Sequence, residues 1–161
     1  MQLKNICLPV KIYNSMDELS QIDQDLIKKS MQAMQHSYSP YSNFKVGAAA
    51  ILNNENIIIG SNQENASYGV TICAERVLLA NHSSLDTPTL INTIAISYKS
   101  KNGSDNQPIT PCGICRQALS EQEFKQKDAI RILLVGKNEI WELENANGLL
   151  PLAFDSSFMP A

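Results

Sequence analysis

Two short cysteine-containing segments carry the clearest chemical potential of this 161-residue chain. The first is Cys73-Ala74-Glu75-Arg76, and the second is Pro111-Cys112-Gly113-Ile114-Cys115-Arg116. Zinc takes thiolates in tetrahedral geometry, and its catalytic sites usually combine three protein ligands with one open position. We therefore expect Cys73, Cys112 and Cys115 to hold one zinc ion, with Glu75 acting on a water molecule in the fourth position.

The other potential ligands of the chain favour an open site over a structural one. A single C-x-x-C pair is ambiguous between a zinc half-site and a redox pair, and a structural zinc site needs a fourth ligand. The fourth cysteine, Cys7, lies outside any motif and is expected to be a bystander thiol. His36 and His82 have no ligand motif around them. Three available thiols thus indicate a catalytic zinc site.

The helix positions of these residues decide whether the site can work. Cys73 is expected where a helix begins, because two residues along a regular helix turn by about 200° and would otherwise separate Cys73 from Glu75. Thr110-Pro111 predicts a second helix start, with Thr as N-cap and Pro in the first turn. Helix N-termini favour thiolates. Arg76 is expected to hydrogen-bond the ligand sulfurs; the alternative is a solvated helix arginine.

Hydrophobic periodicity and turn signals predict the elements around these motifs. A helix should run from Met16 to before Tyr38, capped by Ser15 or Ser20. Residues 1–15 could form an extra edge strand or an extended arm, and residues 148–151 a turn or short helix. Strands are expected at 44–52, 56–60, 92–98, 129–135 and 140–143, with an exposed loop at 99–107. This order predicts an α/β fold, a three-layer α/β/α sandwich with a mixed five-stranded sheet.

Composition narrows the class of protein. The chain is 43% hydrophobic and 18% charged, and its net charge is -3 without a block of Lys or Arg. A nucleic-acid binder normally shows a basic footprint, so a small-molecule substrate is favoured. There is no apolar run of about 20 residues to span a membrane and no signal-peptide pattern, which predicts a cytoplasmic protein.

The motifs resemble those of zinc-dependent cytidine deaminases of the small, homotetrameric nucleoside type. Segments 73–76 and 111–117 are similar to the zinc signature of that family. Segment 38–49, which begins Tyr-Ser-Pro-Tyr-Ser-Asn-Phe, is similar to its opening strand, and segment 62–68 to its ribose-binding segment. Leu149-Leu150-Pro151 with Phe154 resembles its C-terminal element. The resemblance divides the chain into an N-terminal extension, 1–19, and a cytidine deaminase-like catalytic domain, 20–161.

The resemblance implies a role for each matching residue. Glu75 would be the catalytic acid and base, and one Zn²⁺ per subunit would be held by the three cysteines. Phe44 would stack on the pyrimidine, although a strand aromatic of the core is the competing interpretation. Asn62 and Glu64 would bind the ribose 3′-hydroxyl, and backbone groups near Ala74 would recognise the base. Residues at subunit contacts would complete a neighbour's pocket: Ala66, Tyr68 and Phe154.

The implied reaction is hydrolytic deamination of cytidine and 2′-deoxycytidine to uridine and 2′-deoxyuridine, with release of ammonia, in pyrimidine salvage. A zinc-activated water would attack ring C4, while Glu75 passes a proton to N3 and then to the departing amine. The extension, the 99–107 loop and Gln63 depart from the family pattern. Two alternatives remain open: a deaminase of another aminopyrimidine nucleoside such as blasticidin S, and a non-catalytic zinc-stabilised binding protein. A polynucleotide-editing deaminase fits the negative net charge and the lack of a basic track less well.

Overall fold

The computed structural model describes residues 1–87, 89–101 and 105–159. Among these residues the α-helices are α1 (Gln21–Ala33), α2 (Ala74–Ser83) and α3 (Gly113–Gln126). The strands are β1 (Lys11–Tyr13), β2 (Lys45–Leu52), β3 (Ile57–Ser61), β4 (Ile91–Lys99), β5 (Arg131–Val135) and β6 (Ile140–Leu143). Short 3-10 helices occupy Met16–Glu18, Met34–His36, Tyr68–Val70, Asn147–Leu149 and Ser156–Phe158.

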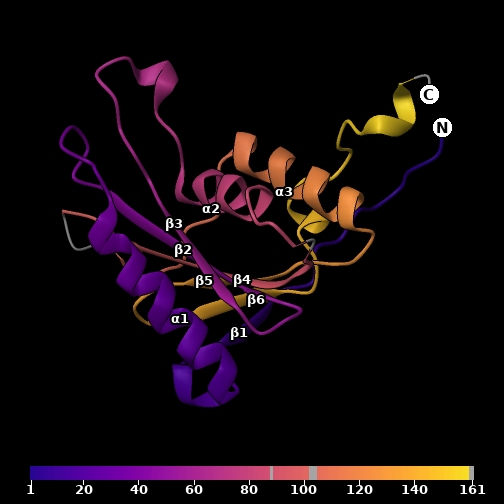
Figure 1. Cartoon of the computed structure of the whole chain (residues 1–161). Coiled ribbons are helices and arrows are strands. Elements are labelled where there is room, and N and C mark those ends of the chain that lie inside the picture. Colours follow the sequence, from indigo (N-terminus) through magenta and orange to yellow (C-terminus); the bar gives the residue numbers. More distant parts are fainter. Residues whose placement is uncertain (88, 102–104, 160–161) are drawn as a thin grey trace.

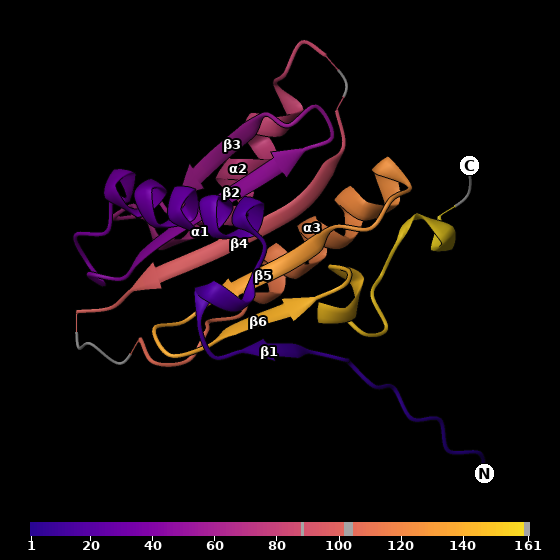
Figure 2. The ribbon, with the colours of Figure 1, turned by 90° about the horizontal axis from the view of Figure 1, so that it is seen from below.

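The strands form one mixed sheet in the order β1-β6-β5-β4-β2-β3. β4 and β5 run parallel, and every other neighbouring pair in this sheet runs antiparallel. α1 covers one face of the sheet, and α2 and α3 cover the other, as two perpendicular views show (Figure 1, Figure 2). The predicted three-layer α/β/α sandwich is confirmed.

The predicted number of strands is wrong, because a sixth strand, β1, joins the edge of the sheet. β1 pairs antiparallel with β6, with Ile12 opposite Trp141. The Glu142 carboxylate on β6 fixes it by accepting hydrogen bonds from Lys11 Nζ at 2.9 Å and the Tyr13 hydroxyl at 3.1 Å. Of the two possibilities left open for residues 1–15, the extra edge strand is therefore the one that Lys11–Tyr13 form, and the side-chain bonds to Glu142 join residues far apart in sequence.

Alternating side chains along the central strands build two hydrophobic cores. On β2, Ala48 and Ala50 pack in the core that includes Leu78 of α2, whereas Ala49 packs in the core that includes Leu26 of α1. β4 and β5 alternate in the same way. Burial on both faces is typical of the central strands of a sheet that is covered by helices on each side. The three alanines let both helical layers approach β2 closely.

The segment predicted as one helix from Met16 onward is interrupted at Leu19, which has extended backbone angles (φ −97°, ψ 160°). Both predicted caps are used in turn: Ser15 accepts a hydrogen bond from Asp17 N and caps the 3-10 helix, and Ser20 accepts one from Asp23 N and caps α1. The helical region ends at His36, before Tyr38, as predicted. Of the predicted 99–107 loop, residues 102–104 lie outside the described residues. No described helix has the length and apolar character to cross a membrane.

Substitution of Gly47 on β2 provides a test of the close contact between α1 and β2. A Cβ atom at this position would lie 2.6 Å from Met34 N and nearer still to the Ser30 carbonyl oxygen. Gly47→Ala should therefore lower the free energy of unfolding by about 1–3 kcal/mol, the usual cost of overpacking. The measurement is urea unfolding, with Gly69→Ala as control because a Cβ there meets nothing within 4 Å. Equal stability of the two variants would contradict this packing.

Candidate zinc centre and substrate cleft

Three cysteine sulfurs from two distant segments meet at one point of the fold. The Cys73 and Cys112 sulfurs lie 3.8 Å apart, and the Cys112 and Cys115 sulfurs lie 3.5 Å apart. All three lie within 4.8 Å of one another. The two segments come together because α2 and α3 pack side by side on the same face of the sheet (Figure 1).

The helix termini place these sulfurs. Cys73 is the N-cap of α2 and Cys112 the N-cap of α3, both with extended backbone angles, and Cys115 lies in the first turn of α3. Neither N-cap side chain makes a capping hydrogen bond to its own helix backbone, so both sulfurs can face a ligand. The positive ends of two helix dipoles therefore converge on the cluster. The requirement that Cys73 lie where its helix begins is confirmed.

The predicted start of α3 at Thr110-Pro111 is wrong by two residues. Cys112 is the N-cap, and α3 begins at Gly113. Thr110 and Pro111 are instead bound by Arg116 from inside the helix: Nη2 donates to Thr110 Oγ1 at 2.9 Å and Nε donates to the Pro111 carbonyl at 2.8 Å. Thr110 therefore does not cap the helix as predicted, because its hydroxyl accepts a hydrogen bond from the Arg116 side chain.

The donor set and its dimensions fit zinc. A tetrahedral ion with Zn–S distances of about 2.3 Å requires sulfur–sulfur distances of about 3.8 Å, and the separations of 3.5 and 3.8 Å agree with this. Three soft thiolates favour zinc over hard cations, which prefer oxygen ligands. Cys73, Cys112 and Cys115 would hold the ion, and three protein ligands would leave zinc able to activate a water molecule. The cluster fits one zinc ion per subunit.

The sulfurs and Glu75 influence one another electrostatically. A hydrogen bond from the Cys115 thiol lowers the pKa of Cys73 to about 6. The same interaction, together with burial, raises the pKa of Cys115. Burial raises the pKa of Glu75, whose residue surface is only 5% exposed. A glutamate held in this way takes up and releases protons closer to neutral pH than an exposed one.

A cleft of about 460 Å³ opens in front of the cysteines. Its walls bring together residues from both cysteine segments with predicted site residues from the β2 and β3 regions. The lining residues are Ser42, Phe44, Val46, Asn62, Glu64, Thr71, Ile72, Cys73, Glu75, Ile109, Thr110 and Cys112. Of the predicted substrate-binding residues, Phe44, Asn62 and Glu64 line this cleft, and Ala74 is fully buried behind it.

Phe44 lies where β2 begins and serves both the core and the cleft. Its ring stacks on Tyr98 of β4, with centroids 5.4 Å apart and planes inclined by 28°. The ring also packs against the core beneath α2 and α3 while one part of it lines the cleft. Phe44 therefore packs against the core, and its stacking on a pyrimidine stays a prediction.

Asn62 is buried, and its side-chain amide is largely occupied by the protein. Its Oδ1 accepts from Ser37 Oγ at 2.6 Å and from Val46 N at 2.8 Å, and its Nδ2 donates to the Phe44 carbonyl at 2.9 Å. An amide nitrogen has two hydrogens, so one N–H donor remains for a ligand. Asn62 thus fixes the backbone around Phe44 as well as facing the cleft.

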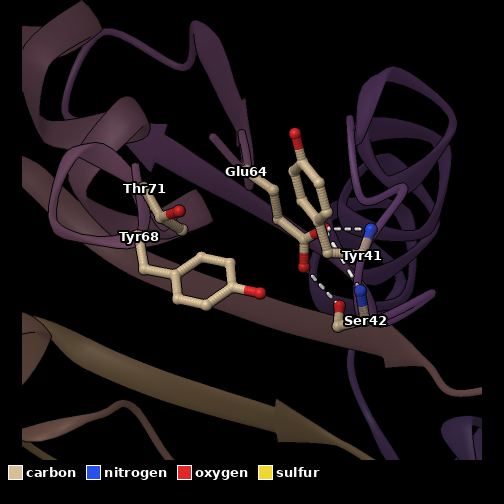
Figure 3. A pocket seen from close by; sticks show the side chains of 5 residues that line it. All are labelled: Tyr41, Ser42, Glu64, Tyr68 and Thr71. Atoms are coloured by element: carbon tan, nitrogen blue, oxygen red, sulfur yellow. Dashed lines mark hydrogen bonds between the residues drawn. The ribbon is translucent and has the colours of Figure 1, made fainter. Parts of the chain in front are cut away.

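Glu64 stands between the cleft and a neighbouring pocket of about 360 Å³, lined by Tyr41, Ser42, Tyr68 and Thr71 (Figure 3). Its carboxylate accepts hydrogen bonds from Tyr41 N at 2.8 Å, from Ser42 N at 3.3 Å and from the Ser42 hydroxyl. These bonds lower the pKa of Glu64, with the Ser42 hydroxyl as the main cause. Ser42 Oγ also accepts from Phe44 N at 2.9 Å. The structure therefore links two of the four predicted substrate-binding residues, Phe44 and Glu64, through Ser42, to which the sequence assigned no role.

Other predicted residues lie apart from the cleft within the single chain. Ala66 and Tyr68 are exposed on the loop after β3, and Phe154 is exposed in the C-terminal segment, where its ring stacks on Phe158. Tyr68 lines only the neighbouring pocket, edge-on to Tyr41. The Arg76 charge contributes to the lowered pKa of Cys73, but no described hydrogen bond joins its guanidinium to a ligand sulfur.

Some residues that line the cleft were not predicted as site residues from the sequence. Ile72, Ile109 and Thr110 line the cleft because they flank the cysteines. Proximity to the cysteine motifs could have identified them, but nothing in their residue types indicates a ligand. Arg116 could not have been distinguished from a solvated helix arginine without knowledge of where its three acceptors lie.

Comparison with known proteins gives a consistent family. Residues 20–128 match the family described as the cytidine and deoxycytidylate deaminase zinc-binding region. The chain is 43% identical over 98 residues to a cytidine deaminase of Halalkalibacterium halodurans. The matched region covers 61% of this chain and 70% of the relative.

Solved structures that resemble this chain are also those of cytidine deaminases. A crystal structure of cytidine deaminase from Burkholderia pseudomallei superimposes with a TM-score of 0.72 at 35% identity, covering 84% of this chain and all of that one. That of Mycobacterium tuberculosis superimposes with a TM-score of 0.64 at 32% identity, covering 81% of this chain and 95% of that one.

Zinc content of single cysteine variants tests the ligand set. Cys73→Ala, Cys112→Ala and Cys115→Ala should each bind far less than one zinc per chain, because two thiolates cannot complete the site. Cys7→Ala is the matched control and should retain one zinc per chain, since Cys7 is exposed and outside the cluster. The measurement is metal analysis of purified protein. Full zinc content in any of the three cluster variants would contradict the ligand assignment.

Proposed function

This chain belongs to the cytidine and deoxycytidylate deaminase family, and we propose that it catalyses hydrolytic deamination of cytidine and 2′-deoxycytidine. The products are uridine or 2′-deoxyuridine and ammonia. One observation carries the proposal: a buried carboxylate, Glu75, lines the same cleft as Cys73 and Cys112 of the three-cysteine cluster. That cleft also contains an aromatic ring for a base and polar groups for a sugar. A non-catalytic binding protein has no need for a buried carboxylate there.

Glu75 is the proposed catalytic residue. Zinc, when bound, acidifies a water molecule in its open fourth position. Glu75 accepts a proton from the attacking water and transfers it to ring N3. Glu75 then takes the remaining proton from the hydroxyl group added at C4 and delivers it to the amine, which leaves as ammonia while C4 becomes a carbonyl. Burial raises the pKa of Glu75, which makes its carboxylate a stronger proton acceptor than that of an exposed glutamate.

The remaining site residues position the nucleoside. Phe44 stacks on the pyrimidine, and backbone groups near Ala74 contact its edge. Glu64 and the free N–H of Asn62 bind the ribose 3′-hydroxyl. Arg76 stabilises the thiolates, because three of them give the zinc ion a net negative ligand shell.

The charge of the cleft favours nucleosides over nucleotides. Its described lining contains two carboxylates, Glu64 and Glu75, and no lysine or arginine. A phosphate on the substrate would therefore meet negative charge without a cationic partner. Among the family's substrates, an uncharged sugar fits this chain better than a deoxycytidylate. The same argument disfavours a polynucleotide.

A tetramer is the proposed assembly. Tyr68 is 76% exposed and Phe154 is 61% exposed, and large aromatic side chains at the surface are typical of subunit contacts. Together with Ala66 they would complete the pocket of a neighbouring subunit. We also propose a cytoplasmic enzyme of pyrimidine salvage, with catalytic domain 20–161 and an extension, 1–19, whose β1 strand lengthens the sheet. Sedimentation of the zinc-loaded protein tests the oligomer.

Glu75→Gln tests the proton-transfer role. Glutamine has nearly the same shape but cannot accept the proton, so kcat for cytidine should fall by about 100- to 10,000-fold. Zinc content should remain at one per chain because the ligands are unchanged. Loss of the cytosine absorbance measures turnover. Wild-type turnover by Glu75→Gln would refute the mechanism, and failure of the zinc-loaded wild type to deaminate cytidine would refute the function.

Glu64→Gln tests recognition of the sugar. Wild-type protein should prefer cytidine over 3′-deoxycytidine by about tenfold or more in kcat/KM, because a hydrogen bond to a charged acceptor contributes about 1.5–3 kcal/mol. The variant should lose most of this preference, while glutamine can still accept from Tyr41 N. An unchanged ratio of the two substrates would show that Glu64 does not bind the 3′-hydroxyl. Parallel assay of blasticidin S tests the competing substrate class.

A further inference from the structure

Arg116 follows the zinc ligand Cys115 on α3 and has no role in the proposed function. All three of its guanidinium nitrogens donate hydrogen bonds. Nε donates to the Pro111 carbonyl at 2.8 Å, Nη1 to the Leu149 carbonyl at 3.0 Å and Nη2 to Thr110 Oγ1 at 2.9 Å. Arg116 thus binds three acceptors from two segments outside α3.

Two of these acceptors belong to the zinc site itself. The Pro111 carbonyl is part of the peptide group that joins Pro111 to Cys112, and Thr110 lines the cleft. The Arg116 backbone N–H also donates to the Cys112 carbonyl at 2.9 Å. The backbone bond is the ordinary first-turn bond of α3, whereas the guanidinium holds the chain immediately before Cys112 and fixes one wall of the cleft.

The third acceptor, the Leu149 carbonyl, belongs to a segment that is itself held in place by hydrogen bonds to α3. Arg116, Ser120 and Glu123 lie four and three residues apart, so they share one face of α3. Ser120 Oγ donates to Asn147 Oδ1 at 2.7 Å, and the Glu123 carboxylate accepts from Ala146 N at 2.7 Å and Asn147 N at 2.8 Å. The 146–149 segment is thereby fixed along α3, and its last residue offers the carbonyl that Arg116 binds.

The geometry requires a planar, branched donor. The three acceptors surround one guanidinium, which presents its donors in fixed directions within a plane. A lysine ammonium can reach one or two of them but cannot hold all three in place. A general need for positive charge on α3 would be met equally by lysine.

We propose that Arg116 is a positioning residue of the zinc centre. It holds the 110–112 segment against α3 and the 146–149 segment, so that the Cys112 sulfur and the Thr110 wall keep their places when zinc and nucleoside bind. The proposal rests on the zinc site and the deaminase activity proposed above. Its first readout is metal release, which does not depend on turnover.

The test compares Arg116→Lys and Arg116→Gln with Lys125→Gln. The control removes the same charge from an exposed position on the same helix, away from the cleft. Zinc release from folded protein to a chromogenic chelator should be about 10- to 100-fold faster in both Arg116 variants, the usual effect of losing a residue that supports a ligand. It should be unchanged in the control. The thiolate-to-cobalt absorption of Co²⁺-substituted protein should shift in the Arg116 variants alone.

Assays in excess zinc separate positioning from simple stabilisation. Arg116→Lys should retain a lowered kcat even when fully loaded with zinc, because the Thr110 wall is displaced. A variant that melts at a lower temperature but keeps the wild-type zinc release rate, cobalt spectrum and kcat would overturn the proposal. If neither Arg116 variant folds, Thr110→Val, which removes one of the three bonds, should still release zinc faster, and an unchanged rate would overturn the proposal. Inactive wild-type protein would refute only the deaminase function.

Discussion

The convergence of three cysteine sulfurs at the N-termini of two helices is the constraint on which the rest of the structure depends. Three thiolates within 4.8 Å would repel one another strongly without a cation. The N-termini of α2 and α3 supply part of the compensating positive charge, and zinc supplies the rest. This requires α2 and α3 to start at the same point on one face of the sheet. The small residues Gly60 and Ala74 at the contact of β3 with α2 keep that helix close to its strand.

Two buried glutamates have different roles: Glu123 stabilises the fold, and Glu75 faces the cleft. Glu123 is 5% exposed and accepts hydrogen bonds from three backbone N–H groups, at Ile130, Ala146 and Asn147. Glu75 is equally buried, but it faces the cysteine cluster and the cleft, and burial raises its pKa. A buried carboxyl group costs stability unless it is satisfied. The fold satisfies Glu123 with peptide groups and leaves Glu75 directed at the place where a substrate would bind.

The sequence was informative where the signal is local and less so where distant segments meet. Strand periodicity identified β2 to β6, and the requirement for Cys73 at the start of a helix followed from the angular spacing of Cys73 and Glu75. The start of α3 was misplaced because Arg116 takes Thr110 and Pro111 as acceptors, which capping rules cannot foresee. β1 depends on Glu142, and the roles of Ser42 and Arg116 depend on partners far away in sequence. Such contacts exist only once the sheet has assembled.

The central claim is that one zinc ion, held by three cysteines beside Glu75, makes this chain a cytidine deaminase. Titration of metal-free protein with Zn²⁺ while cytidine turnover is followed tests it most directly. Activity should rise in proportion to added zinc and reach a plateau at one zinc per chain. Full activity in the metal-free protein, or no activity once one zinc per chain is bound, would contradict it.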